Sequence, residues 1–475
     1  MRKMNRKFLF IAMLLMSLGS FLNSCKDKDE DGEKIVSPNA TEFTESADGK
    51  TITVTDKGEG VGNYTFTADK TWVLNGLVYV NETQTLTIEA GTLVQGKPGT
   101  AENASALVVA RGGKLNAVGT AEKPIVFTAE ADNYEGTGVA KEVQGLWGGI
   151  IILGKATTNN STSEKAIEGI PTNETRGLYG GTDDNDNSGT MKYVSIRHGG
   201  TDIGEGNEIN GLTLGAVGKG TTLEYIEVIS NKDDGIEFFG GCPQIKYALV
   251  SGCGDDSFDY DEGFHGKGQF WCTIQSADGD RMGEHDGGPS DNQTGMPYAT
   301  PVILNATYFG NEAGKVITFR ENAGGTYANS LFVNQDGGID IEYLQDDAGA
   351  MVACTYKMFE DDYLNVQNNV FYNVKAITTE ADDNGKSLFK ISVPKDDAGK
   401  EKYPAPDEVK SAWAAAFAGN TNKVANPGIS ASNPVPASPQ TSDLFQTTDS
   451  FFTPANYKGA FDGSNWAKGW SLLFQ

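Results

Sequence analysis

Residues 225–239 read YIEVISNKDDGIEFF: a short apolar strand, a turn rich in Asn, Asp and Gly, and a second short strand. The same pattern returns at residues 247–260 as YALVSGCGDDSFDY. The first strand has further counterparts at residues 193–196 (YVSI) and 271–274 (WCTI). The copies, which start at 193, 225, 247 and 271, therefore lie 32, 22 and 24 residues apart. Steps of this size predict stacked repeats.

The repeats favour one solenoid fold over another. The L-x-x-L-x-L spacing of leucine-rich repeats is absent. Short strands with glycine corners are typical of a right-handed parallel β-helix, an all-β solenoid in which each coil pairs with its two neighbours. The longest step predicts a loop insertion around residues 204–220, and a second one is expected around 283–301. Such insertions lie on one face, which is often the binding face.

The open ends of a β-helix expose strand edges that need covers. Residues 407–419 are expected to form a small helix, which begins with acidic residues and ends at a glycine. The aromatic residues between 451 and 470 are expected to pack as a cap over the side or end of the solenoid, and helix and cap together span about residues 405–475. A sugar-stacking surface is the alternative for these aromatic residues.

Three further aromatic residues, Tyr225, Tyr247 and Trp271, align in successive repeats. We expect them to stack on one another inside the core, as large aromatic side chains usually do. The alternative is a stack on the outside that offers a platform to a glycan.

Residues 1–24 have the composition of a secretory signal peptide. Four basic residues precede an apolar run over residues 8–18, which is shorter than the roughly 20 residues that a permanent membrane helix needs. The segment Leu22-Asn23-Ser24-Cys25 resembles a lipobox, although Asn23 departs from the usual pattern. The resemblance implies cleavage before Cys25 and a lipid anchor on that cysteine. An ordinary secretory signal with an unrelated cysteine is the alternative.

Residues 25–45 are expected to form a tether, which leaves residues 46–475 as a single β-helix domain. The acidic run at residues 26–33 resembles the surface-export signal of Bacteroidota lipoproteins. That resemblance implies an outer-membrane protein that faces the cell exterior. In physical terms the same run is a solvated linker, and the two interpretations are compatible.

Charge and cysteine content limit the classes of partner. The formal net charge is −26 at pH 7, and loss of the four basic residues of segment 1–24 makes it −30. Nucleic acid and anionic lipid both require basic patches, so neither is expected as a partner, whereas cations or a basic protein face are. Four cysteines match no zinc-ligand spacing and are expected to be small buried residues, with a Cys242–Cys253 disulfide left open: Cys242, Cys253, Cys272 and Cys354.

Aligned on their strands, the repeats place four aspartates at equivalent positions: Asp202, Asp234, Asp256 and Asp280. A neighbouring column holds Glu205, Glu237 and Asp259. Neighbouring coils lie about 4.8 Å apart, so stacked carboxylates repel unless a cation, protonation or solvent relieves them. Oxygen ligands at this density predict Ca²⁺. The alternative is that Asp is simply a common turn residue.

A second candidate calcium site lies at residues 182–189, which read TDDNDNSG. Its carboxylates are Asp183, Asp184 and Asp186. The loop resembles the start of an EF-hand but lacks the terminal glutamate that completes such a site.

The same acidic repeats allow an enzyme hypothesis. Polygalacturonase-like hydrolases carry acids on successive β-helix coils, with an inverting pair about 6.5–9.5 Å apart. Here the residues would be Asp234, Asp255 and Asp256, assisted by Arg281 and His265. His265 stands in Phe-His-Gly instead of Gly-His-Gly, and no Arg-x-Lys pair follows. An enzyme would turn its carboxylates into a groove with Arg281 and a histidine in reach, whereas a cation site would turn them toward one another.

Three segments together resemble a group of bacterial surface lipoproteins with a pectin-lyase-like β-helix: WGGIIILG at 147–154, DDGIEFF at 233–239, and GAF with the final tryptophans at 459–470. The resemblance covers most of residues 70–475 and implies fold and location, since the group has no settled activity. We therefore expect a cell-surface binding or adhesion module for carbohydrate or a surface protein, including an outer-membrane transporter. The glycan-degrading hydrolase is the alternative, and a purely structural spacer is a third hypothesis.

Overall fold

The computed structural model describes residues 37–475 except 205–206, 290–291 and 384. The expected signal peptide, Cys25 and the acidic run at 26–33 lie outside the described residues. The chain divides into two units, Met1–Ser37 and Pro38–Gln475, and every element below belongs to the second. None of the helices in the described part of the chain combines the length and the apolar character needed to cross a bilayer.

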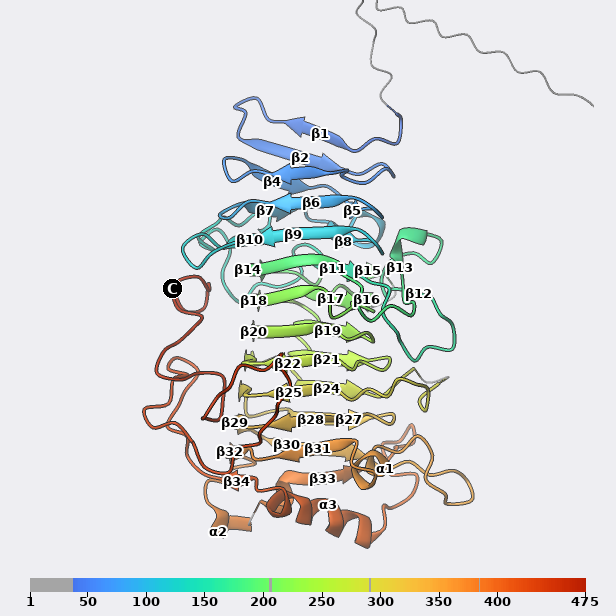
Figure 1. Ribbon diagram of the computed structural model, residues 1–475, viewed down its shortest axis with the longest axis vertical. Helices are drawn as coiled ribbons and strands as arrows, with labels where there is room; N and C mark the ends of the chain where they lie inside the picture. The colour runs from blue at the N-terminus through green and yellow to red at the C-terminus, as the bar shows by residue number, and fades with distance from the viewer. Residues whose placement is uncertain (1–36, 205–206, 290–291, 384) are drawn as a thin grey trace, which may run out of the picture. The chain divides into compact units, whose positions relative to one another are not determined.

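The second unit is a right-handed parallel β-helix, as the repeats predicted (Figure 1). Its larger sheet has 20 strands. They are β1 (Glu42–Glu45), β2 (Thr51–Thr55), β3 (Tyr64–Phe66), β4 (Thr71–Leu74), β6 (Thr85–Ile88), β7 (Leu93–Gly96), β9 (Lys114–Val118), β10 (Ile125–Ala129), β14 (Gly189–Arg197), β18 (Thr222–Ile229), β20 (Gln244–Ser251), β22 (Lys267–Gln269), β23 (Cys272–Ile274), β25 (Val302–Leu304), β26 (Thr307–Phe309), β28 (Gly325–Ala328), β29 (Leu331–Gln335), β31 (Leu364–Gln367), β32 (Val370–Val374) and β34 (Lys423–Val424).

The second sheet has 10 strands, each from a different coil. They are β5 (Leu77–Val80), β8 (Ala106–Val109), β11 (Ile150–Leu153), β17 (Leu212–Gly215), β19 (Ile236–Phe239), β21 (Phe258–Asp261), β24 (Arg281–Asp286), β27 (Lys315–Arg320), β30 (Gly337–Glu342) and β33 (Phe389–Ser392). Two hairpins, β12 (Lys165–Ala166) with β13 (Leu178–Tyr179) and β15 (Asp202–Gly204) with β16 (Asn207–Glu208), stand outside both sheets. The helices are α1 (Thr355–Glu360), α2 (Glu380–Asp383) and α3 (Asp407–Gly419).

The first strand corrects the expected boundary between tether and domain. Strand β1 pairs antiparallel with β2 and therefore covers the edge of the first coil, although it falls within the range 25–45 that was expected to be linker. The sequence around it is polar and exposed, so it lacks the apolar alternation that marks the later strands.

The core runs through the coils as columns of inward side chains. Ile226, Val228, Ile236 and Phe238 are all buried, and they alternate with outward residues as strand geometry requires. The predicted helix at 407–419 is confirmed as α3, which lies at the far end of the stack (Figure 1), where Trp413 stacks on Phe389 with ring centroids 4.5 Å apart.

The expected aromatic stack exists, but on the outside and with a different last member. Tyr193, Tyr225 and Tyr247 stack with centroids 4.3 Å apart, and Phe270 follows at 5.0 Å. Strand β20 pairs Leu249 with Cys272, so Trp271 is one residue out of register and lies in the core. The four stacked residues have φ between 51° and 60°, which bends the strand and turns these rings outward.

The C-terminal aromatic block packs on the side of the β-helix and covers this outer stack. The Trp466 ring meets Tyr247 edge-on at 5.4 Å, and the Trp470 ring meets Tyr193 at 5.6 Å. Figure 1 shows the C-terminal segment along one side of the coils. The cap interpretation is therefore confirmed, and a glycan platform on Tyr225 and Tyr247 is not available while the block is in place.

One buried carboxylate attaches the end of the chain. Glu227 is fully buried and accepts hydrogen bonds from Ser195 Oγ at 2.5 Å, from the Leu472 amide at 3.1 Å and from Ser471 Oγ. We expect Glu227→Ala to lower the free energy of unfolding by about 1–3 kcal/mol, because the donors lose a charged acceptor. It should also release the C-terminal segment to limited proteolysis. Glu224→Ala is the control, since Glu224 makes only a surface ion pair with Lys192. Equal protection in both variants would contradict this role.

Candidate functional site

The outer face of the ten-stranded sheet carries a column of acidic residues. Glu237 on β19, Asp259 on β21 and Glu284 on β24 are register partners on adjacent strands. They point outward because their neighbours along each strand point into the core. Asp234 and Asp256 lie in the turns that lead into β19 and β21. We call these five residues the carboxylate ladder.

The ladder forms two overlapping triads. Carboxylate oxygens of Asp234, Glu237 and Asp259 lie within 4.8 Å of one another, and so do those of Asp256, Asp259 and Glu284. Asp259 belongs to both triads. Two more triads at the preceding turns extend the acidic surface: Asp233, Asp234 and Asp255, then Asp255, Asp256 and Asp280. The structure thus brings together six of the predicted acids: Asp234, Glu237, Asp255, Asp256, Asp259 and Asp280.

Asp280 is not the partner that the alignment predicted. Its amide donates to the Asp255 carbonyl at 3.1 Å, so it continues the column of Asp255. The place after Asp256 belongs to Arg281, whose amide donates to Asp256 Oδ1 at 2.6 Å. The cause is the coil between β21 and β24, which pairs Phe258 with Gly283 and is one residue longer than the predicted step of 24.

Asp202 lies outside the ladder as well. Strand β14 pairs Thr190 with Thr222, a step of 32, whereas β17 pairs Leu212 with Ile236, a step of 24. The extra residues form the β15–β16 hairpin, in which Asp202 pairs with Glu208. The place before Asp234 belongs to Asn210, whose Oδ1 accepts from the Asp234 amide at 3.2 Å. Glu205 lies outside the described residues.

Burial and mutual repulsion raise the pKa values of the ladder carboxyl groups. Burial raises the pKa of Asp234, Glu237, Asp256 and Asp259 well above the ordinary value, and neighbouring carboxylates raise it further. Burial also raises the pKa of Asp261, the next outward residue on β21, to about 7. Deprotonating the ladder therefore requires a compensating positive charge.

Two arginines supply such charge at one end of the ladder. Arg281 Nη1 lies 3.3 Å from Asp256, 3.0 Å from Asp280 and 2.5 Å from Glu284. Arg320 Nη2 lies 2.9 Å from Glu284 and 2.8 Å from Asp286. Within the described part of the chain, Asp234, Glu237 and Asp259 form no ion pair. The triad of Asp234, Glu237 and Asp259 is therefore the part of the ladder that has no ion-pair partner among the described residues.

The donor set suits a hard cation. All its ligands are carboxylate oxygens, and Ca²⁺ takes six to eight oxygens at about 2.3–2.6 Å. Two oxygens on one such ion lie at most about 5 Å apart, which matches the 4.8 Å limit within each triad. The residues present thus fit the Ca²⁺ predicted from the sequence. Three carboxylates leave coordination positions for water or another oxygen ligand.

The loop at 182–189 does not gather its three aspartates. Asp183 Oδ1 accepts from the Asn185 amide at 3.0 Å, and Asp184 Oδ1 accepts from the Thr157 amide at 3.0 Å. The carboxylate of Asp186 faces Ser188 Oγ at 3.5 Å, and burial raises its pKa. These hydrogen bonds are typical of aspartates in turns. At this loop the turn interpretation therefore describes the three aspartates better than a shared calcium site.

The histidine rings do not face the ladder. His265 follows β21, at the opposite end of that strand from Asp255 and Asp256, and its Nε2 faces Asp184 Oδ2 at 3.4 Å. His285 is buried, its ring stacks 3.9 Å from the Tyr260 ring, and burial lowers its pKa to about 3. His198 is buried beside Asp132. The predicted catalytic set of three aspartates, Arg281 and His265 is therefore brought together only in part.

One ladder residue, Glu284, and three charged residues around the ladder were not predicted from the sequence. Glu284, Asp261, Asp286 and Arg320 alternate with core residues on β21, β24 and β27. The alternation of polar and apolar residues was visible in the sequence at these positions. However, β24 and β27 lie after the copies of the repeat that resemble one another most. The register that joins them to Asp259 depends on turn lengths that only pairing reveals.

Comparisons with known proteins agree with the architecture. A family model described as a pectate-lyase like beta helix domain matches residues 58–418. The crystal structure of Jun a 1, the major allergen from cedar pollen, aligns with 79% of this chain and 88% of its own at 10% identity. Its TM-score is 0.24, too low to support any conclusion. No curated protein matches the sequence.

Proposed function

The chain belongs to the family of pectate-lyase-like β-helix domains, and on that premise we propose that it is a carbohydrate-binding module that holds Ca²⁺ on its ladder. The observation that carries the proposal is the pair of carboxylate triads that share Asp259 on the outer sheet face. Glu237, Asp259 and Glu284 keep partial exposure, so a bound ion would be reachable from solvent. Coordination positions that protein leaves free can take sugar hydroxyls or carboxylates.

An acidic glycan is the ligand class that this site favours. The chain has a formal charge of −26, so it repels polyanions unless a bound cation bridges the two. A Ca²⁺ ion held by Asp234, Glu237 and Asp259 would provide that bridge. A basic face of a surface protein, including an outer-membrane transporter, is the other partner that the charge allows.

The proposed location is the cell surface. It rests on the sequence of the N-terminal segment: the signal-like residues 1–24, Cys25 as the lipidation site, and the acidic run after it. A lipid on Cys25 would anchor the protein to the outer membrane and present the β-helix on a tether. Mass spectrometry of the membrane-extracted chain should find diacylglycerol on Cys25, and an unmodified N-terminus elsewhere would contradict the anchor.

The hydrolase alternative is weaker on this geometry. Arg281 is held by three carboxylates, and His285, which follows Glu284, turns its ring into the core toward Tyr327. Within each triad, one carboxylate oxygen per residue lies within 4.8 Å of the others, a close approach that a shared cation accommodates. The geometry therefore resembles a cation site more than a hydrolytic pair.

Calorimetry with the full chain tests the proposal. Ca²⁺ should bind the chelator-treated protein, and polygalacturonate should bind only when Ca²⁺ is present. Asp259→Asn should abolish both. Asp340→Asn is the matched control, because Asp340 lies in the same outward column but is neutralised by Lys315 at 2.6 Å. Binding of glycan without Ca²⁺ would contradict the bridging role, and release of shorter oligosaccharides would establish the hydrolase instead.

A further inference from the structure

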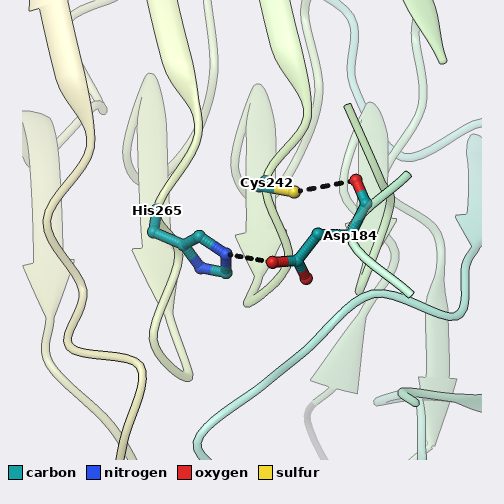
Figure 2. A group of neighbouring side chains, drawn as sticks. All are labelled: Asp184, Cys242 and His265. Atoms are coloured by element: carbon teal, nitrogen blue, oxygen red, sulfur yellow. Dashed lines mark hydrogen bonds and ion pairs between the residues drawn. The ribbon is translucent and has the colours of Figure 1, made fainter. Parts of the chain in front are cut away.

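A second cluster of ligand-type side chains lies at the other end of the same strands. Cys242 follows β19 and His265 follows β21, so adjacent coils bring them together, and the loop before β14 adds Asp184. One ligand atom from each residue lies within 4.8 Å of the other two. Figure 2 shows the His265 ring pointing at the Asp184 carboxylate, with the Cys242 sulfur beside the same residue.

Hydrogen bonds fix two of these side chains in a ligand-ready state. His265 Nδ1 lies 2.8 Å from the Gly263 carbonyl, which can only accept, so Nδ1 carries a proton. In the neutral ring, Nε2 then has a lone pair, and it faces Asp184 Oδ2 at 3.4 Å. Asp184 Oδ1 accepts from the Thr157 amide, so Oδ2 is the oxygen that faces the ring. A lone pair facing a carboxylate oxygen is repulsive unless a proton or a metal ion lies between them.

Cys242 is placed as a ligand and not as a nucleophile. Its sulfur is nearly buried and contacts the Asp184 carbonyl at 3.3 Å. Burial, followed by the nearby Asp184 carboxylate, raises the pKa of the thiol to about 11. His265 is not oriented to take the thiol proton, because Nδ1 is bonded to Gly263 and the Nε2 lone pair faces Asp184 Oδ2. An activated thiol of the cysteine-hydrolase type is therefore absent at this cluster.

We propose that Asp184, Cys242 and His265 bind a zinc-class divalent ion. Zn²⁺ takes thiolate, imidazole and carboxylate ligands at about 2.0–2.3 Å, and second hydrogen bonds such as those to Gly263 and Thr157 orient its ligands. Binding would replace the thiol proton with a zinc–sulfur bond and release that proton to solvent. The mixed sulfur, nitrogen and oxygen set is chemically distinct from the all-oxygen ladder, so the two sites select different ions.

The ion would connect segments that are far apart in sequence. Asp184 is separated by 58 residues from Cys242 and by 81 from His265. A zinc ion here would attach the loop at 182–189 to two turns of the β-helix. The His265 and Asp184 side chains are 21% and 38% exposed, so the fourth coordination position is open to water.

Cobalt substitution in the full chain tests the site directly. One equivalent of Co²⁺ should give the near-ultraviolet absorption of a sulfur-to-cobalt charge transfer, and Zn²⁺ should remove it. Cys242→Ala should abolish the band, whereas His265→Gln and Asp184→Asn should weaken binding by more than about tenfold, the loss that removing a hydrogen-bond partner of a ligand already causes. Asp183→Asn is the control for the loop, and Asp259→Asn, which disables the ladder, should leave the band unchanged.

A second measurement keeps the test decisive if a variant fails to fold. Zn²⁺ should protect Cys242 of the wild-type chain from alkylation, as mapped by peptide mass spectrometry, without protecting Cys354. A band that persists in Cys242→Ala, or equal alkylation of Cys242 with and without Zn²⁺, would overturn the proposal.

Discussion

Asp259→Asn is expected to raise the melting temperature of the chelator-treated protein and to remove the stabilisation that Ca²⁺ gives the wild type. Asp259 belongs to both triads, so neutralising it relieves repulsion in each of them. The same change removes a ligand of the proposed Ca²⁺ ion. Asn keeps the shape of the side chain, so the effect reports charge and not packing.

The expected size follows from linkage. A site filled at 100 times its dissociation constant stabilises the folded state by about 2.7 kcal/mol, which is the size expected for one Ca²⁺ on the triad of Asp234, Glu237 and Asp259. Differential scanning calorimetry of the full chain with chelator and with Ca²⁺ measures this. Asp340→Asn should behave as the wild type, because Lys315 already neutralises Asp340. Destabilisation of Asp259→Asn in chelator would show that the carboxylate is stabilising without a cation.

Between pH 6.5 and about pH 8.5 the chelated protein is expected to lose stability as the pH rises. The folded-state pKa of Asp234, Glu237, Asp256 and Asp259 is raised well above the unfolded value, chiefly by burial. A raised carboxyl pKa contributes stability that is complete below the unfolded pKa and is lost as the pH rises through the folded pKa. The pKa of Asp261 is about 7, so its contribution to stability is lost completely within this pH window.

Within this window another group opposes the trend: burial lowers the pKa of Lys458 to about 8, so its contribution to stability rises as the pH passes that value. Below pH 6.5 the buried His285, whose pKa is lowered to about 3, acts in the opposite direction, since only the unfolded imidazole is protonated there. Above about pH 8.5 the buried cysteines begin to affect the pH dependence of stability, because cysteine thiols of the unfolded chain lose their protons there. Each ladder carboxyl that stays protonated in the folded state costs about 1.4 kcal/mol per pH unit, so a fall of several kcal/mol is expected.

Chemical denaturation at several pH values, with chelator and with Ca²⁺, measures the pH dependence. Ca²⁺ should flatten the curve, because the ion replaces the protons as the compensating charge. Asp261→Asn should reduce the slope near pH 7 and leave the slope at higher pH. Stability that rises with pH in chelator would show that the ladder is ionised in the folded protein without a metal ion.

The sequence by itself determined the architecture. The spacing of YIEVISNKDDGIEFF and its copies is set by the length of one coil, and inward and outward residues alternate within each strand. Both are local properties, so the parallel β-helix, the helix at Asp407–Gly419 and the outward acids on β19 and β21 could be predicted. The aromatic cap followed from the need to cover apolar surface.

The tertiary structure decided which of these residues meet. A one-residue difference in one coil moves Asp280 beside Asp255 and puts Arg281 after Asp256. The hairpin insertion removes Asp202 from the column and puts Asn210 in its place. Asp184, Cys242 and His265 share no sequence motif, and only the stacking of coils brings them together. Register and insertion length are properties of pairing between coils, and pairing is a long-range interaction that no single repeat encodes.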